Sequence, residues 1–260
     1  MTHYNIHVLE TVGVVIPTYM RSRETTRAIK SVLSQTHGSC QVIVVDDGSP
    51  IEIFQELEAS IKDSRVRFIK IEHCGNPGKV RNVGLRELET QYVSFLDSDD
   101  FWENNKIETQ LNQMKKTNCK AGCSNARIVG GTQEFPYFGK VSSKLKLSDL
   151  LKTNFIICSS TLIERDLLLK VGGFSTSHYV QSAEDYATWL RIAKFTNWSY
   201  SNELLTNYTV TGNRFSITYG SRNRYQTILA FIDFANWQEL NLKKRKIGFE
   251  FLAKLMRYTL

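Results

Sequence analysis

Short apolar runs alternate with amphipathic stretches over the first hundred residues, and this alternation constrains the fold more than any other feature of the chain. Four runs rich in β-branched and aromatic residues are too short for helices, which is typical of buried strands. They cover residues 12–16, 42–45, 66–71 and 92–96, and helical spacing fills the intervals at 24–33, 51–61 and 79–88. Buried strands separated by helices predict a mostly parallel sheet covered on both faces. The alternating pattern of the third run predicts a strand at a sheet edge.

The second half of the chain has a less regular pattern. Residues 160–163 predict a further strand, and residues 165–170 predict a short helix that ends at the glycines 172–173. Another helix is expected to begin at residues 182–185 and to turn Trp189 and Leu190 toward the core. We therefore expect an α/β fold in which shorter elements extend the sheet.

The composition is that of a globular protein of 260 residues. Hydrophobic residues make up 42% of the chain, which is enough to bury a sizeable core. No apolar stretch reaches the roughly 18 residues of a membrane span, and the first ten residues lack the pattern of a secretory signal, so we expect a cytoplasmic protein. The five cysteines form no CxxC pair, which favours reduced thiols over a zinc site.

Three aspartates, Asp97, Asp99 and Asp100, stand within four residues directly after the fourth predicted strand. Like charges this close together are unfavourable unless a cation or a proton offsets them. Because side chains alternate along an extended chain, Asp97 and Asp99 are expected on the same side. Two such carboxylates make half of a site for a hard divalent cation, whose other ligands are water or phosphate oxygens. From these residues alone, a solvated acidic turn before a helix remains the alternative.

Unusual side chains follow the first and second predicted strands as well. Pro17, Thr18 and Tyr19 follow the first strand, and Asp46 and Asp47 follow the second. In open α/β sheets ligands bind beyond the carboxyl ends of the strands, so we expect the three strand ends to border one crevice. This convergence favours the metal-site interpretation. No GxGxxG or GxxxxGK[ST] pattern occurs, which disfavours a dinucleotide site and a P-loop.

Six segments resemble glycosyltransferase family 2, the inverting enzymes with a GT-A fold, and they stand in the family's order. The segments are Val-Val-Ile-Pro-Thr-Tyr at 14–19, Ser-Val-Leu-Ser-Gln-Thr at 31–36, Val-Val-Asp-Asp-Gly-Ser at 44–49, Arg-Asn-Val-Gly at 81–84, Phe-Leu-Asp-Ser-Asp-Asp at 95–100, and Val-Gly-Gly-Phe at 171–174 followed by Glu-Asp at 184–185. Each segment is weakly specific, but together they span roughly residues 12–215.

The resemblance implies a Rossmann-like, mostly parallel sheet flanked by helices, with added acceptor-side elements. It implies a single catalytic domain at residues 1–236, whose nucleotide-binding half covers about 10–118 and whose acceptor-binding half covers about 119–236. A basic, amphipathic C-terminal helix is expected at 237–260. The chain is most similar to the small bacterial members that build O-antigen and other surface polysaccharides.

The family pattern also implies a UDP-sugar site at the strand ends. Pro17 and Thr18 then belong to the nucleotide loop, and the ring of Tyr19 packs near the uracil, which suits a flat apolar group. Either Asp46 or Asp47 accepts a hydrogen bond from uracil N3–H, and the sequence leaves both open.

Further roles are implied for the diphosphate and the metal. Asp97 faces the ribose or the metal, Asp99 is the main metal ligand and Asp100 supports it, so that Mn²⁺ or Mg²⁺ bridges the two phosphates and stabilises the leaving UDP. Arg81 lies near the nucleotide, with an ordinary helix-packing arginine as the alternative. The chain lacks the family's Tyr-Arg-x-His pattern near residue 208, and Arg214 is a candidate for the missing cation, against a plain loop arginine.

Glu184 and Asp185 are the candidates for proton transfer. An inverting transfer needs one carboxylate to take the proton of the acceptor hydroxyl, and we expect Asp185 in this role with Glu184 as its neighbour or substitute. The alternative is an acidic first turn of a helix, a position that favours negative charge.

Residues 237–260 carry six Lys/Arg and two Glu, more than half of the net charge of +7. Their apolar helical face suits either an anionic membrane surface or a core position. We expect a lipid-diphosphate-linked sugar as acceptor, the inner face of the cytoplasmic membrane as a partner surface, and no nucleic acid. UDP-glucose and a β-linkage are favoured, with UDP-galactose or a UDP-N-acetylhexosamine as alternatives. The rival functions are a nucleotidyltransferase and a non-catalytic polyanion-binding module.

Overall fold

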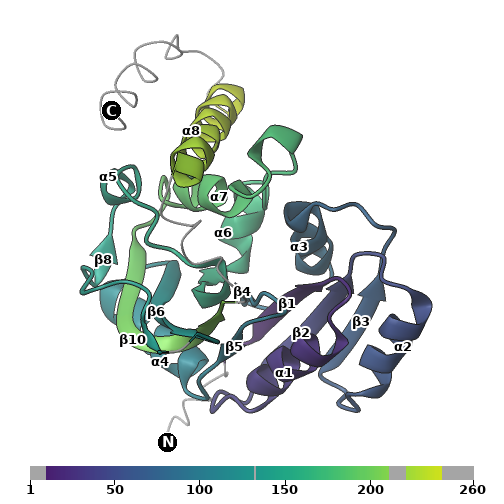
Figure 1. The fold of residues 1–260 in the computed structure, drawn as a ribbon. Helices are drawn as coiled ribbons and strands as arrows, with labels where there is room; N and C mark the ends of the chain where they lie inside the picture. Colours follow the sequence, from purple (N-terminus) through teal and green to yellow (C-terminus); the bar gives the residue numbers. More distant parts are fainter. Residues whose placement is uncertain (1–9, 132, 211–220, 242–260) are drawn as a thin grey trace, which may run out of the picture.

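The computed structural model describes residues 10–131, 133–210 and 221–241. Its centre is one sheet with the strand order β3-β2-β1-β4-β9-β6-β10-β5, and Figure 1 shows helices on both sides of it. The strands on this path are β1 (Val12–Thr18), β2 (Cys40–Asp46), β3 (Val66–Lys70), β4 (Tyr92–Phe95), β5 (Phe101–Trp102), β6 (Ala121–Val129), β9 (Leu162–Glu164) and β10 (Trp198–Thr209). Two short strands, β7 (Phe135–Pro136) and β8 (Lys144–Leu145), pair with β6 and β10.

The four strands predicted in the first hundred residues pair in parallel with one another, and β6 and β10 form a second parallel pair. β1 lies between β2 and β4, and the register pairs Thr18 with Asp46 and Val15 with Phe95. The carboxyl ends of these strands therefore meet at one edge, as predicted. β3 pairs with β2 at the sheet edge, which confirms the interpretation of its alternating pattern.

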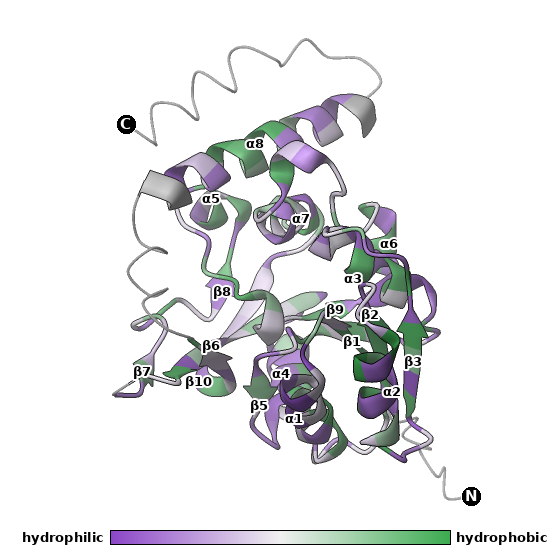
Figure 2. Cartoon of the chain, turned by 45° about the vertical axis from the view of Figure 1, so that its right-hand side comes forward, coloured by the Kyte–Doolittle hydropathy of each residue, from purple (hydrophilic) through white to green (hydrophobic). Residues whose placement is uncertain are grey.

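The helices divide between the two faces of the sheet. Alternate residues of β1 point to opposite faces, so Val14 joins a core with α1, α2 and α4, whereas Val15 joins a core with α3, α6, α7 and α8. Figure 2 shows apolar residues along β1 and β2 and a mixture of apolar and polar residues on the covering helices. The helices are α1 (Ser22–Leu33), α2 (Ile51–Ala59), α3 (Pro77–Arg86), α4 (Lys106–Thr117), α5 (Leu147–Leu150), α6 (Arg165–Lys170), α7 (Glu184–Ile192) and α8 (Ser221–Asn241).

Two predicted boundaries differ from the structure for local reasons. α3 begins two residues before the predicted start, because the Asn76 side chain accepts a hydrogen bond from the Lys79 amide at 3.0 Å and Pro77 occupies the first turn. The strand predicted at 160–163 is Leu162–Glu164. Before it, the Ser160 and Thr161 hydroxyls donate to carbonyls three residues back and stabilise the 3₁₀ turn Cys158–Ser160.

α8 packs on α7 through apolar side chains and one buried ion pair. Phe231 and Phe234 join the core, and Asp233 contacts Arg191 of α7 and accepts a hydrogen bond from Ser175 at 2.7 Å. The predicted boundary between residues 236 and 237 falls inside α8, and the basic cluster that follows lies outside the described residues. Within the described ranges, no helix combines the length and apolarity needed to cross a bilayer.

Candidate active site

A cavity of about 420 Å³ opens at the carboxyl ends of the parallel strands, within the range of small-molecule sites. Its lining comes from the ends of β1, β2 and β4, the loop after β3 and the start of α3. The lining residues are Pro17, Thr18, Tyr19, Arg21, Asp47, His73, Gly75, Pro77, Val80, Arg81, Asp97, Ser98 and Asp99. The three predicted strand ends therefore do converge on one crevice.

The end of β1 presents an aromatic ring to this cavity. Tyr19 stacks on His73 with ring centroids 4.6 Å apart, and it is 46% exposed. The next residue, Met20, has a φ of 58°, a left-handed conformation that costs about 1–3 kcal/mol in a non-glycine residue. Its amide donates to the Ser49 hydroxyl at 2.8 Å, which holds the turn. The strained turn thus fixes Tyr19 on one side of Met20 and Arg21 on the other.

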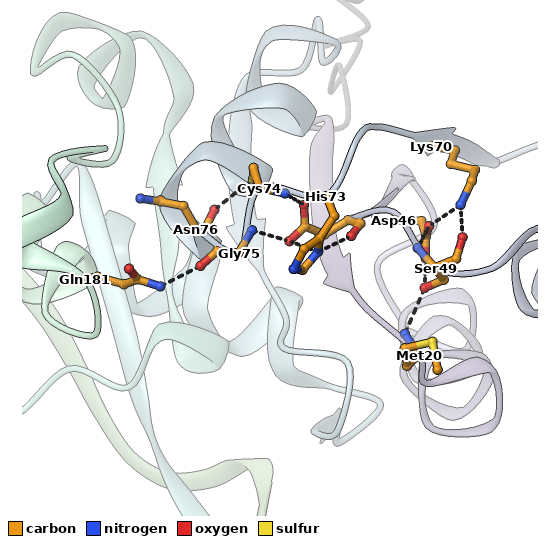
Figure 3. A network of polar contacts seen from close by, with 10 residues as sticks. Met20, Asp46, Ser49, Lys70, His73, Cys74, Gly75, Asn76 and Gln181 are labelled. Atoms are coloured by element: carbon orange, nitrogen blue, oxygen red, sulfur yellow. Dashed lines mark hydrogen bonds and ion pairs between the residues drawn. The ribbon is translucent and has the colours of Figure 1, made fainter.

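Asp46 and Asp47, which the sequence could not tell apart, point to different places. The Asp46 carboxylate accepts hydrogen bonds from the Ser49 amide at 2.8 Å and hydroxyl at 2.5 Å, and it lies 3.2 Å from Lys70 Nζ. Figure 3 shows this group closing the turn after β2. Asp47 lines the cavity, and its two oxygens accept the amides of Cys74 at 2.8 Å and Gly75 at 3.0 Å. Asp47 is therefore the aspartate that a ligand in the cavity can reach.

His73 is a cavity residue that the sequence reasoning missed. Its Nδ1 lies 2.7 Å from the Asp47 carbonyl oxygen, which can only accept, so this nitrogen carries the hydrogen. The same loop is tied to the second half of the chain, because Gln181 Nε2 donates to the Gly75 carbonyl at 2.5 Å (Figure 3). The strand-end rule, applied to the third strand as well, would have found this loop.

Asp97 and Asp99 both line the cavity, as predicted, but not through alternation along a strand. β4 ends at Phe95, and Ser98, in the turn between them, lines the cavity as well. The side chains of Asp97 and Asp99 are 34% and 28% exposed, and each pairs with an arginine. Arg81 Nη2 donates to Asp97 Oδ1 at 2.7 Å, and Arg21 Nη1 donates to Asp99 Oδ2 at 2.5 Å. Sequence reasoning also missed Arg21, although it stands two residues after Tyr19 in the same strand-end segment.

Two partly exposed carboxylates suit a hard divalent cation. Within the described part of the chain, no three His, Cys, Asp or Glu side chains lie close enough to hold a metal by themselves. The half-site of Asp97 and Asp99, completed by phosphate or water oxygens, therefore stays a prediction.

Asp100 points away from the cavity. It is 1% exposed, and its two oxygens accept the Ser159 hydroxyl at 2.6 Å and the Thr209 amide at 2.9 Å. Burial, with the nearby charge of Asp97 adding to it, raises the pKa of Asp100 well above its usual range. We therefore assign Asp100 to joining the β4 turn to β10 rather than to the metal set.

Arg81 joins the two halves of the site. Its buried guanidinium donates to Asp97 on one side and, through Nη1, to Glu184 Oε1 at 2.9 Å on the other, and it lies over the Phe174 ring. The start of α3 comes this close to the second half of the chain because residue 78 is glycine: a Cβ there would lie 2.5 Å from the Ser175 carbonyl oxygen and 3.2 Å from Cγ of Glu184. Arg81 therefore lines the cavity and connects the two acidic clusters, and its predicted contact with the nucleotide stays a prediction.

Glu184 and Asp185 begin α7 beside this arginine and do not line the cavity. Glu184 is held by Arg81, whereas Asp185 Oδ1 accepts only the amide of Tyr186, at 2.6 Å, among the described residues. Burial, together with the charge of Glu184, raises the pKa of Asp185 to about 7. A carboxylate with this pKa is suited to accept a proton near neutral pH. The remaining predicted site residue, Arg214, lies outside the described residues.

The fold is that of the GT-A glycosyltransferases. A mannosyltransferase from Pyrobaculum calidifontis, solved in complex with GDP-Man and Mn²⁺, superposes with a TM-score of 0.63 over 96% of this chain and 70% of that one, at 16% identity. The family model described as Glycosyl transferase family 2 matches residues 13–172. The chain belongs to this family.

Curated relatives agree with the family match. The chain is 32% identical to the UDP-Glc:alpha-D-GlcNAc-diphosphoundecaprenol beta-1,3-glucosyltransferase WfgD of Escherichia coli, over 74% of this chain and 73% of the relative. It is 30% identical to the putative teichuronic acid biosynthesis glycosyltransferase TuaG of Bacillus subtilis, over 79% and 81%. The predicted family, the GT-A fold and the assignment as a glycosyltransferase are confirmed. The family assignment therefore favours glycosyl transfer over the nucleotidyltransferase and the non-catalytic alternatives.

Proposed function

We propose that the enzyme transfers a hexose, with inversion, from a UDP-sugar to a sugar on a lipid diphosphate during assembly of a bacterial surface polysaccharide. The observation that carries this proposal is the convergence of Tyr19, Asp47, Asp97 and Asp99 on one cavity beside the acidic pair of α7. The substrates named for WfgD support UDP-glucose and a β-linkage. UDP-galactose and the UDP-N-acetylhexosamines are the alternative donors.

The nucleotide is proposed to bind between the ends of β1 and β2. Tyr19 offers an apolar ring for the uracil, and the second lone pairs of the Asp47 oxygens are available for uracil N3–H. Asp47 is preferred over Asp46 because it lines the cavity, whereas the Asp46 carboxylate closes the turn after β2 with Ser49 and Lys70. Pro17 and Thr18 form the floor of this part of the cavity.

Asp99 and Asp97 are proposed to hold Mn²⁺ or Mg²⁺ together with the donor diphosphate. The bound ion would neutralise charge that develops on the diphosphate as UDP leaves. The carboxylate pair in the cavity and the Mn²⁺ in the Pyrobaculum enzyme support this assignment. Arg81 holds Asp97 in place from the protein side.

Asp185 is proposed as the catalytic base. The acceptor oxygen attacks the anomeric carbon from the side opposite UDP and gives its proton to Asp185. The bond between the anomeric carbon and the diphosphate oxygen breaks, and its electron pair stays with UDP. A single displacement of this kind converts an α-linked donor to a β-linked product. The pKa of about 7 supports Asp185 over Glu184, whose charge is already paired with Arg81.

We also propose that the protein binds peripherally to the inner face of the membrane that carries the acceptor. Exposed apolar side chains at Leu169 and Phe195 support this, and Lys170 Nζ lies over the Phe195 ring at 4.3 Å. Lysine beside exposed apolar groups suits an anionic interface. Cosedimentation with vesicles containing anionic lipid should decrease with salt and with Phe195→Ser, and unchanged binding by that variant would exclude this surface.

The transfer itself is tested with purified protein, a panel of UDP-sugars and a synthetic sugar-diphosphate-lipid acceptor. We expect UDP release that requires one donor, the acceptor and Mn²⁺ or Mg²⁺, and that EDTA stops. Mass and linkage of the product identify the sugar and its anomeric configuration. Release that ignores EDTA, or none from any donor and acceptor pair, would contradict the proposed reaction.

A further inference from the structure

Arg21 holds the carboxylate that the metal needs. Its guanidinium donates to Asp99 Oδ2 at 2.5 Å, and both residues line the cavity. Asp99 is the proposed main metal ligand, so the arginine and the metal would share one carboxylate. The Arg21 guanidinium therefore already places a positive charge beside Asp99.

The two arginines of the cavity differ in their freedom to move. Arg81 is 7% exposed and holds two carboxylates at once, Asp97 and Glu184. The Arg21 side chain is 40% exposed, and Asp99 is its one side-chain partner among the described residues. Its backbone, in contrast, is fixed between the strained turn at Met20 and the first turn of α1. Arg21 can thus change partner by side-chain rotation alone.

The charge of the cavity gives a reason for such a change. Three carboxylates face it, those of Asp47, Asp97 and Asp99, against the two guanidinium groups of Arg21 and Arg81. A diphosphate adds further negative charge, which is unfavourable unless cations accompany it. A guanidinium matches phosphate oxygens as well as carboxylate oxygens, because its donors form a planar fork.

We propose that the Arg21 side chain exchanges one partner for another. Before the donor binds, it neutralises Asp99; when metal and donor bind, it releases Asp99 to the metal and binds the donor diphosphate. This inference rests on the proposed function, because it assigns a role in the same donor site. It follows that a metal ion alone must compete with Arg21 and binds weakly. When UDP is present, Arg21 has a new partner, so metal and UDP strengthen each other's binding.

The exchange is tested by binding measurements that need no turnover. Mn²⁺ affinity without nucleotide is measured by electron paramagnetic resonance, and UDP affinity at saturating Mn²⁺ by calorimetry. Arg21→Gln should bind Mn²⁺ alone about tenfold more tightly and UDP about tenfold more weakly, a change of roughly 1.4 kcal/mol in each case. Uridine, which lacks the diphosphate, should bind both proteins equally.

Arg23→Gln is the matched control, because Arg23 is exposed in the first turn of α1, two residues after Arg21, and its loss changes the net charge equally. It should bind Mn²⁺ and UDP as the unaltered protein does, and melting curves check that both variants are folded. Unchanged Mn²⁺ affinity in Arg21→Gln, or unchanged UDP affinity, would each overturn the exchange. Failure of the unaltered protein to bind UDP at any metal concentration would overturn the proposed donor site as well.

Discussion

The two acidic clusters of the site, Asp97 with Asp99 and Glu184 with Asp185, contain the same kind of carboxyl group in different environments. In the first pair both members line the cavity and each contacts an arginine, Asp97 with Arg81 and Asp99 with Arg21. In the second pair, Arg81 holds only Glu184, and burial raises the pKa of Asp185 to about 7. One environment pairs carboxylates with arginines beside the cavity, and the other prepares a carboxylate to take a proton.

The largest expected effect is the loss of the proposed base. Asp185→Asn should lower kcat by about 10³-fold, since a positioned base contributes roughly 10²–10⁴-fold. UDP affinity at saturating Mn²⁺ should not change, because the side chain does not line the cavity. Steady-state rates and calorimetry measure the two quantities, with exposed Asp166→Asn as the control. Transfer that survives would move the role to Glu184.

A smaller loss, and a different one, is expected in the first cluster. Asp99→Asn should reduce Mn²⁺-dependent UDP binding and transfer by roughly 100-fold, because the metal loses its main carboxylate. UDP binding in EDTA should change much less. The assignment of Asp99 to the metal would be wrong if Asp99→Asn slowed transfer but left the Mn²⁺ dependence of UDP binding unchanged.

The pH profile separates the clusters without a mutation. Since the pKa of Asp185 is raised to about 7, this group is protonated below that pH and cannot accept the acceptor's proton. We expect kcat to fall about tenfold per pH unit below about 7 and to level off above it. UDP affinity should stay nearly constant across that limb. A kinetic pKa near 4 would contradict the assignment of Asp185.

The smallest effect on chemistry is expected at Asp100, the member of the acidic run that faces inward. Asp100→Asn keeps the size of the side chain but disturbs its bonds to Ser159 and Thr209. We expect about 1–3 kcal/mol of lost stability with near-normal Mn²⁺ affinity, measured by denaturant unfolding and paramagnetic resonance. Strongly weakened Mn²⁺ binding in a folded variant would instead identify Asp100 as one of the metal ligands.

Several features of the site could be predicted from residues close together in the chain. Asp97 and Asp99 were expected on one side and both line the cavity, although the turn after β4 places them there rather than alternation along a strand. The rule for strand ends brought Tyr19 and the acidic pair after β2 to the same edge. Two adjacent residues could not be told apart from the sequence. Whether Asp46 or Asp47 faces the cavity depends on the turn that Ser49 and Lys70 close.

Local patterns in the chain were sufficient to predict the parallel sheet, the convergence of its strand ends and the family, because each depends on residues close together in sequence. The ion-pair partners of the site residues could be read only from the folded structure. Arg81 reaches Glu184, 103 residues away, and Arg21 reaches Asp99, 78 residues away. Such ion pairs are set by how α1, α3 and α7 pack against the sheet, and no local pattern records that packing. The packing also gives the two acidic clusters their different surroundings, and burial and charged neighbours set the pKa of a carboxyl group.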